Sequence, residues 1–349
     1  MRSEYFTLSE IQKAYYMGRN EGFELGGKST QITYVFETEL DCDKLESAIN
    51  REVLRQPMLR SVVLSESKQK ILDETPYYHI TRIDLSGATE NKKNETLENE
   101  KRKAFSKKFV PDQWPLFEWK YITTGGIKNY VIVSFDLLIA DGSSLMIYAN
   151  EVRMIYDGRE DELPPLSRTY MDFVREKEEK RKSKKYLSDK QYWLDRMDEI
   201  HPAPELPYRK MRSPEVRGEE VYRSVMYLDE KNWADLCDSC NEHGVTPTIA
   251  VLTAYAMTLG YWSEEKNFTI NMTVTERKRN KMENVVGDYT SSVLIPVDKE
   301  VAVSDDFWAG ASTLGNIFRS SYRHASFEGV ELIKEIARHR NMTAMSVMP

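Results

Sequence analysis

The segment from Asp136 to Ser144 (DLLIADGSS) contains the residue types best suited to chemistry in this chain. Asp136 ends an apolar stretch, Asp141 follows as a second carboxylate, and hydroxyl side chains come directly after it. In α/β proteins, functional groups tend to lie where strands end at a crevice. A buried carboxylate there must be paired or hydrogen-bonded, because an isolated buried charge is costly. With a tuned pKa, such a carboxylate can act as a general acid or base.

A structural explanation accounts for the same residues without any chemistry. Asp141 or Ser143 would cap the helix expected to follow, and Asp136 would close a turn. The residues alone favour this explanation over a catalytic one. The motif therefore becomes informative only together with the rest of the chain.

Other potential sites are weaker. Cys237 and Cys240 have redox or metal spacing, but they lie in a helical pattern without a second pair, which favours buried structural thiols. We expect no metal site, because the histidines lack ligand spacing; they are His79, His201, His243, His324 and His339. The sequence contains no GxGxxG or GxSxG motif, which argues against a dinucleotide-binding enzyme and a serine hydrolase.

The composition is that of a globular protein. The 349 residues are 40% hydrophobic and 30% charged, and the net charge of −7 argues against a general nucleic-acid binder. No apolar run reaches the roughly 18 residues of a membrane helix. The N-terminus lacks the apolar core of a secretory signal, and three cysteines do not form a disulfide framework. We therefore expect a cytoplasmic protein that binds neither nucleic acid nor membrane.

Alternating strands and helices must position the motif. A strand at 129–136 (NYVIVSFD) is apolar enough to be buried on both faces, and a helix is expected at 143–156. Further strands are expected at 30–37, 61–64, 117–123, 222–228, 268–275 and 292–297, and further helices at 8–19, 43–55, 170–196, from 229, and at 248–262, 305–323 and 329–340. The Pro-rich segment His201–Pro207 predicts a linker. Together the elements indicate two similar α/β lobes.

The spacing of Asp136, Asp141 and Ser144 (DxxxxDxxS) resembles the signature of heterocyclization domains of nonribosomal peptide synthetases. In that family the signature replaces the paired-histidine motif (HHxxxDG) of ordinary condensation domains. This chain has Asp136 and Leu137 where the two histidines would stand.

Five further segments resemble motifs of the same family, in the family's order. They are Phe6–Arg19, with the motif residues Gln12, Tyr15 and Arg19; Arg55–Arg60, with Gln56 in place of a histidine; Tyr192–Pro207; Thr246–Trp262; and Gly287–Ser291, with Asp288, Thr290 and Tyr289 in place of a phenylalanine. Ordered matches over nearly the entire chain are not expected by coincidence.

The resemblance implies an α/β, chloramphenicol-acetyltransferase-like fold with two lobes in a V and a tunnel between them. The expected division is an N-terminal acetyltransferase-like lobe at 1–180, a connecting helix and Pro-rich linker at 181–207, and a partial C-terminal lobe at 208–349. The family's sixth motif begins near Pro349. We therefore expect a chain truncated there, with an incomplete second lobe and ring-closing activity that the truncation could abolish.

The resemblance also implies the reaction. A carrier-bound acyl or peptidyl thioester would be joined to a carrier-bound cysteine, serine or threonine, and cyclodehydration would give a thiazoline or oxazoline. The partners implied are upstream and downstream peptidyl carrier proteins and an adjacent adenylation domain. No cofactor is expected on the chain itself, because the phosphopantetheine belongs to the carrier proteins.

The residues expected to serve this reaction are Asp136, Asp141 and Ser144. Asp136 would orient the acceptor or organise the lobe around the tunnel. For Asp141 we favour a buried ion pair with Arg277 across the lobe junction, which would fix the loop.

Three other functions remain open from the sequence. The first is an ordinary condensation or acyltransferase domain that makes an amide or ester without cyclization. The second is an inactive docking module for carrier proteins. The third is a metal site at the two aspartates.

Overall fold

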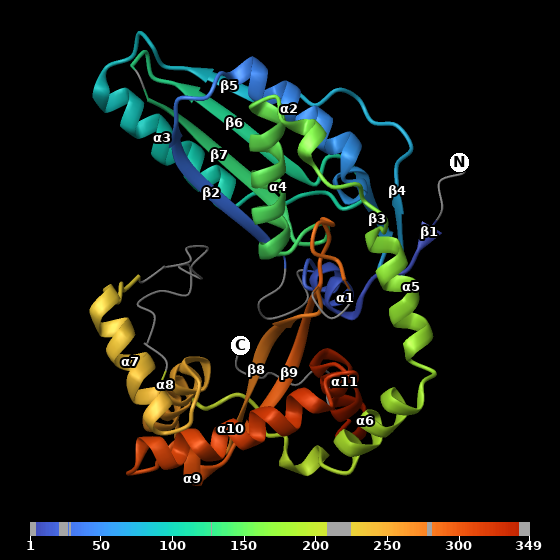
Figure 1. Ribbon diagram of the computed structural model, residues 1–349, viewed down its shortest axis with the longest axis vertical. Coiled ribbons are helices and arrows are strands. Elements are labelled where there is room, and N and C mark those ends of the chain that lie inside the picture. The colour runs from blue at the N-terminus through green and yellow to red at the C-terminus, as the bar shows by residue number, and fades with distance from the viewer. Residues whose placement is uncertain are drawn as a thin grey trace. The chain divides into compact units, whose positions relative to one another are not determined.

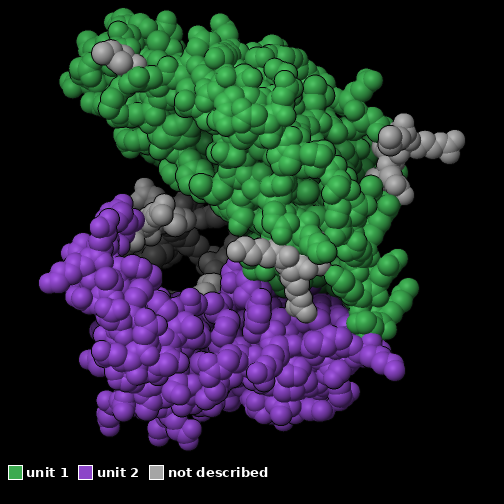
Figure 2. All heavy atoms as spheres, viewed as in Figure 1, with its two compact units in different colours: residues 1–183, 275–291 green, residues 184–274, 292–349 purple. Residues whose placement is uncertain are grey.

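The computed structural model describes residues 5–20, 27, 29–126, 128–207, 225–277 and 281–341. The chain divides into two compact units, which Figure 2 colours separately. Unit 1 comprises residues 1–183 and 275–291, and unit 2 comprises residues 184–274 and 292–349. The sequence-based division placed 275–291 in the C-terminal lobe, whereas the structure assigns it to unit 1.

Both units contain helices and strands (Figure 1). The helices are α1 Glu10–Met17, α2 Cys42–Arg55, α3 Glu90–Phe105, α4 Gly142–Tyr156, α5 Tyr170–Lys180, α6 Lys184–Leu194, α7 Glu230–Glu242, α8 Pro247–Trp262, α9 Lys299–Ala302, α10 Phe307–Arg323 and α11 Gly329–His339, with short 3-10 turns at Pro57–Arg60, Glu160–Glu162 and Met197–Glu199. The strands are β1 Tyr5–Phe6, β2 Gln31–Thr38, β3 Ser61–Ser65, β4 Lys68–Ile71, β5 Thr81–Asp84, β6 Phe117–Thr123, β7 Asn129–Asp136, β8 Phe268–Thr275 and β9 Thr290–Val297.

The central strand of unit 1 is β7, the strand that ends at Asp136. The described residues form a sheet of order β2-β7-β6-β5, in which β7 is antiparallel to both neighbours. Alternate β7 side chains pack on opposite faces of the sheet. Val131, Val133 and Phe135 join the core under α2 and α4, and Ile132 joins the cluster under α3. Because both faces are covered (Figure 1), β7 is buried from Val131 to its end.

Apolar side chains at helical spacing fix α4 on this sheet. Leu145, Tyr148, Val152 and Ile155 are all buried, as expected for one face of a helix. The ring of Tyr148 meets that of Phe135 edge to face, with centroids 4.9 Å apart. This packing fixes where β7 ends and α4 begins, and it therefore positions the residues between them.

The remaining strands form two smaller sheets among the described residues. In unit 1, β1, β4 and β3 form a sheet in the order β1-β4-β3, with antiparallel pairs. Strands β8 and β9 pair with each other, and their apolar residues form a core with α8 and α10. None of the helices described is long and apolar enough to cross a membrane.

Most expected elements are found within a few residues of their predicted bounds, but the short elements β1, β4, β5 and α9 were not predicted. Helix α3 was not predicted, because its sequence is mostly charged and buries little beyond Leu97 and Ala104. The single helix expected at 170–196 ends at Lys180 and resumes at Lys184. Between them Arg181, Lys182 and Ser183 make turn-type hydrogen bonds three residues back, in a stretch without apolar residues to hold a straight helix. Of the strand expected at 222–228, residues 222–224 lie outside the described residues, and 225–228 form no strand.

Candidate functional site

Asp136 lies at the end of β7 and is completely buried. Its carboxylate accepts two hydrogen bonds from Nη2 of Arg19, at 2.6 and 2.5 Å, and a third from the backbone N–H of Leu138 at 2.9 Å. Arg19 is held in place through Nη1, which donates to Ser29 Oγ at 2.9 Å and to the Phe109 carbonyl at 3.0 Å. Asp136 is therefore a buried carboxyl group bound by one arginine.

Burial and the ion pair act on Asp136 in opposite directions. Burial raises the pKa of the Asp136 carboxyl above its usual value, because the charged form loses its hydration. The Arg19 guanidinium and the Leu138 N–H favour the charged form and offset part of that rise. The ionisation of Asp136 thus depends on Arg19 remaining in contact with it.

Asp141 is the N-cap of α4 and also the partner of Arg277. One carboxylate oxygen accepts from the Ser144 N–H at 2.6 Å and from Arg277 Nη2 at 2.9 Å, and the other accepts from the Tyr289 N–H at 3.1 Å. The Ser144 hydroxyl donates to the Gly287 carbonyl at 2.6 Å and accepts from Arg277 Nη2, also at 2.6 Å. Both the cap and the ion pair anticipated for Asp141 are thus present, and Asp141 and Arg277 belong to the same compact unit.

Segment 275–291 is held in unit 1 by further hydrogen bonds. The side-chain oxygen of Gln56, at the end of α2, accepts from the Val286 N–H at 3.0 Å. The Tyr170 hydroxyl, at the start of α5, donates to the Asp288 carbonyl at 2.8 Å. Together with the Asp141 and Arg277 contacts, these bonds explain why the segment belongs to unit 1 although it follows β8 in the sequence.

Replacing Gly287 with alanine is expected to destabilise unit 1. A Cβ at Gly287 would lie 2.4 Å from Cδ2 of Tyr170, whose ring is fully buried and cannot move aside. Overpacking of this kind costs about 1–3 kcal/mol, which thermal unfolding would detect. Gly142→Ala is the matched control, because a Cβ there meets no atom within 4 Å. Equal melting temperatures for the two variants would contradict the close packing.

Helix α1 supplies the motif residues Gln12 and Tyr15, and Arg19 follows its C-cap Gly18. The Gln12 amide donates to the Leu138 carbonyl at 2.6 Å, and its oxygen accepts from the Ser9 N–H at 2.9 Å. It also accepts from the Gln69 amide at 3.0 Å. Gln12 therefore ties α1 to the turn after β7. Tyr15 is partly buried, and burial raises the pKa of its hydroxyl well above its usual range, with the Asp288 charge as the next cause.

Asp288 and Thr290 complete the set of motif residues. Asp288 is 1% exposed, and one of its carboxylate oxygens accepts from the Thr290 N–H at 3.1 Å. Its Oδ2 has no hydrogen-bond partner among the described residues. Burial raises the pKa of Asp288 to about 7, and the nearby Asp141 charge adds to the rise. Asp136, Asp141 and Asp288 are thus all buried in unit 1, but in three different environments.

A buried pair of glutamates was not found by sequence reasoning. Glu52 on α2 is completely buried, and neither of its carboxylate oxygens has a hydrogen-bond partner among the described residues. Burial, followed by the charge of Glu151, raises the pKa of Glu52 to about 9. Glu151 is bound by Arg55 at 3.0 Å and by Gln56 at 2.8 Å. In the sequence both glutamates look like ordinary helix-surface residues.

Replacing Glu52 with glutamine is expected to change how stability depends on pH. The pKa of Glu52 is about 9 in the folded chain and about 4.3 in the unfolded chain. The folded chain therefore loses stability as the pH rises between these two values. Glu52→Gln removes this slope and should gain on the order of 1 kcal/mol or more relative to the parent near pH 8. Urea unfolding at several pH values measures this, with the exposed Glu95→Gln as control. Parallel pH curves for parent and Glu52→Gln would exclude a protonated Glu52.

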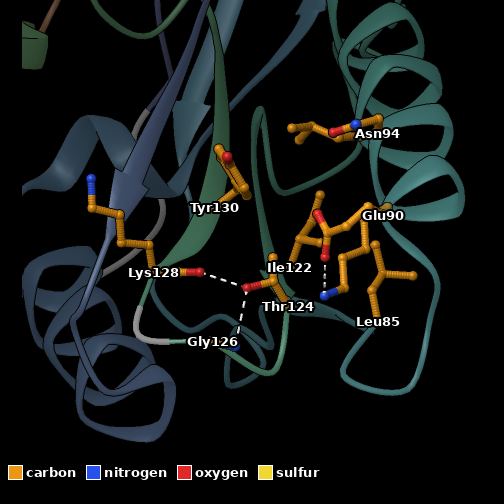
Figure 3. Close-up of a pocket in the computed structure, with 10 residues that line it drawn as sticks. Leu85, Glu90, Asn94, Ile122, Thr124, Gly126, Lys128 and Tyr130 are labelled. Atoms are coloured by element: carbon orange, nitrogen blue, oxygen red, sulfur yellow. Dashed lines mark hydrogen bonds and ion pairs between the residues drawn. The ribbon is translucent and has the colours of Figure 1, made fainter.

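The other features expected or found do not belong to this cluster. A cavity of about 280 Å³ lies at the opposite end of β7, between α3 and the sheet (Figure 3). Its lining combines apolar residues such as Leu85 and Ile122 with Lys93 and Lys128, whose ammonium groups are paired with glutamates.

The described residues hold no group of three or more potential metal-ligating side chains. Cys240 is buried but Cys237 only partly, so the expected pair of buried thiols is only half present.

Comparisons with known proteins agree on one family. The family model of the condensation domain matches residues 2–348. The chain is 34% identical to bacitracin synthase 1 of Bacillus licheniformis over 99% of its own length, and 27% identical to phenyloxazoline synthase MbtB of Mycobacterium bovis over 98%. It spans only 7% and 24%, respectively, of these relatives.

A solved structure is similar over the same range. It is the cyclization-docking bidomain of the nonribosomal peptide synthetase EpoB from Sorangium cellulosum. The TM-score is 0.86 at 26% identity, and the alignment covers 99% of this chain and 70% of that one. The α/β fold expected from the motifs is therefore the fold of condensation-type domains.

Proposed function

Because this chain belongs to the condensation-domain family, we propose that it acts as a heterocyclization domain of a nonribosomal peptide synthetase. It joins a carrier-bound acyl or peptidyl thioester to a carrier-bound cysteine, serine or threonine. The acceptor side chain then attacks the new amide carbonyl, and loss of water gives a thiazoline or oxazoline. The similarity to a cyclization-docking bidomain and to a phenyloxazoline synthase supports this proposal.

The observation that carries the proposal is the chemistry of segment 136–144. An ordinary condensation domain, by the resemblance of the motifs, would have histidines at the positions of Asp136 and Leu137. Here the segment has no imidazole, and its two carboxyl groups are buried and bound by Arg19 and Arg277. The segment is therefore built to hold a shape rather than to take a proton from the acceptor amine.

We assign positioning roles to Asp136, Asp141 and Ser144. Their side chains are almost fully buried, and their polar atoms bind groups of the same chain. A thioester is already activated, so amide formation requires mainly a neutral amine held in the correct orientation. Ring closure is harder, because hydroxide is a poor leaving group and needs a proton donor. That donor must come from residues other than these three.

The partners follow from the reaction. Both substrates are thioesters, and we propose that each arrives on the phosphopantetheine arm of a peptidyl carrier protein, one upstream and one downstream. An adenylation domain would load the acceptor amino acid onto its carrier. The phosphopantetheine belongs to the carriers, so the chain itself needs no bound cofactor.

The mass of the product tests the proposal. The native gene product is incubated with an acyl-loaded donor carrier protein and with a carrier protein that bears cysteine, serine or threonine. The mass of the released product is then measured by mass spectrometry. We expect a product one water lighter than the open amide for at least one of these acceptors. With an alanyl carrier, which has no attacking side chain, only the open amide should form.

The alternatives give different masses. An open amide with every acceptor would identify an ordinary condensation domain. Binding of loaded carriers without any product would identify a docking module. Either result would contradict heterocyclization.

A further inference from the structure

Tyr289 contacts both members of the ion pair between Asp141 and Arg277. Its backbone N–H donates to Oδ2 of Asp141 at 3.1 Å. Its ring lies against the guanidinium group of Arg277, whose central carbon is 4.2 Å from the ring centroid. Asp141 Oδ1 and Arg277 Nη2 are themselves 2.9 Å apart. One residue of segment 275–291 therefore binds the carboxyl group through its backbone and the guanidinium group through its side chain.

The ring contacts Arg277 in a direction that its hydrogen bonds leave open. A guanidinium group donates hydrogen bonds in its own plane. The terminal nitrogens of Arg277 donate four of them, at 2.6–2.9 Å, to Met282, Val285, Asp141 and Ser144. These bonds fix the group within its plane but oppose a tilt out of that plane only weakly. The negative face of an aromatic ring attracts a cation, so the Tyr289 ring supplies the restraint that the hydrogen bonds do not.

Helix α5 holds the ring of Tyr289 in this position. The rings of Tyr170 and Phe173, at the start of α5, lie beside it, with centroids 5.3 and 4.8 Å from that of Tyr289. All three side chains are at most 2% exposed. The Tyr170 hydroxyl also donates to the backbone carbonyl of Asp288 at 2.8 Å. Because protein interiors are close-packed, the ring of Tyr289 cannot turn away from Arg277 without displacing this cluster.

The hydroxyl group of Tyr289 contributes nothing to this arrangement. It is buried and has no hydrogen-bond partner among the described residues. Leaving a buried hydroxyl without a hydrogen bond is unfavourable. The motif that this segment resembles usually has phenylalanine here, which provides the same ring without the hydroxyl. The requirement at position 289 is therefore an aromatic face.

We propose that Tyr289 is a positioning residue whose ring fixes the orientation of Arg277 and, through Arg277, the segment from Asp141 to Ser144. This inference rests on the proposed function, in which that segment holds the acceptor in the correct orientation. An aliphatic side chain of similar size would fill much of the same space, but it has no negative face for the guanidinium charge. Activity should therefore depend on the electronic character of the ring and not only on its volume.

The first test changes the charge distribution of the ring with little change in its size. In the native gene product, position 289 receives phenylalanine, or phenylalanine with one, two or three fluorine atoms on its ring. Fluorine withdraws electrons and so weakens the negative face of the ring. We expect kcat for total product, open amide plus ring, to fall stepwise with each fluorine, by about 10-fold over the series. The KM for loaded carriers should stay the same, because a fully buried ring touches no carrier protein.

Two single substitutions and a second position serve as controls. Tyr289→Phe should retain most of the parent kcat, whereas Tyr289→Leu should lose about as much as the trifluorinated ring. Phe268 is fully buried in unit 2 and has no cation over its ring among the described residues, so the same fluorine series there should leave kcat unchanged. A kcat that does not respond to fluorine at position 289, or that falls equally at position 268, would overturn the role of Tyr289.

The outcomes separate this role from the function on which it rests. A parent protein that forms only the open amide would contradict heterocyclization, but the fluorine series would still test Tyr289, because the open amide is counted. A parent protein that forms no product would contradict the proposed function, and the role of Tyr289 would then be decided by a measurement that needs no activity.

That measurement is an NMR spectrum of the 349-residue chain with nitrogen-15-labelled arginine. The ring current of Tyr289 should shift the guanidinium protons of Arg277 upfield. We expect the shift to persist in Tyr289→Phe and to disappear in Tyr289→Leu. Arg196 lies 4.2 Å from the ring of Tyr192 and is the internal control, because its own shift should be the same in every variant. A spectrum without an upfield guanidinium resonance that depends on residue 289 would overturn the proposal.

Discussion

Arg277→Met should lower the free energy of unfolding by about 3–5 kcal/mol, because it leaves the buried Asp141 carboxylate without its cation. Arg277 is only 6% exposed and donates four hydrogen bonds of 2.6–2.9 Å. Two go to the carbonyls of Met282 and Val285, and two go to Asp141 and Ser144. Methionine fills much of the same space but donates none of them. Chemical denaturation measures the loss, and segment 275–291 should become accessible to proteases first.

A double-mutant cycle isolates the ion pair in this result. Asp141→Asn in the Arg277→Met background removes the unpaired charge, so the double variant should be more stable than Arg277→Met alone. Arg277→Lys is a second comparison, because lysine keeps the charge but cannot make the forked contacts of arginine. An Arg277→Met protein as stable as the parent would show that Asp141 does not depend on this partner.

Arg19→Met should also lower the free energy of unfolding, by about 3–5 kcal/mol near pH 8. This loss should become smaller as the pH is lowered. Without Arg19, only the Leu138 N–H still opposes the effect of burial on Asp136, so the pKa of Asp136 rises further above the unfolded value. A group whose folded pKa is raised in this way loses stability as pH increases through that range. Below about pH 3 Asp136 is protonated in both states, and only the contacts of Arg19 with Ser29 and Phe109 are lost.

The control for this prediction is Asp136→Asn in the Arg19→Met background. Because the amide of asparagine is neutral, the stability of this double variant should no longer depend on the ionisation of residue 136. Only the small loss of stability from the missing Arg19 contacts should remain. Unfolding curves at several pH values compare the two variants directly. If Arg19→Met lowers the free energy of unfolding by the same amount at acidic and alkaline pH, the ionisation of Asp136 is not involved.

The strand at 129–136 and the helix after the motif were predictable, because their patterns are local. A continuous apolar run ending in Asp136 is typical of a strand buried on both faces, and Asp141 before a helical pattern predicts a cap. Helix α3 was not predictable in this way, since it buries only Leu97 and Ala104 among its apolar residues and has no wide apolar face. The comparisons confirmed the family and the resemblance to cyclization domains. The ordered motifs predicted both, because the order and spacing of motif residues carry information that composition does not.

The partners of the buried charges were harder to predict from the sequence. Arg19 and Asp136 are 117 residues apart, and Arg277 and Asp141 are 136 apart. Periodicity describes only neighbours along the chain, so it cannot show that these groups meet. The same reason explains why the sequence did not show that segment 275–291 contacts Gln56, Tyr170 and Asp141. It also explains why Glu52, which looks like a surface residue of α2, was overlooked although it is completely buried.

The fate of the donor carbonyl oxygen tests the central claim most directly. A heterocyclization domain forms its ring by attack of the acceptor side chain on the amide carbonyl, so the oxygen of that carbonyl leaves as water. A donor thioester labelled with a heavy oxygen isotope in its carbonyl group should therefore give an unlabelled ring and labelled water when a cysteinyl carrier is the acceptor. A ring that retained the label, or an open labelled amide as the final product, would contradict the function proposed for this chain.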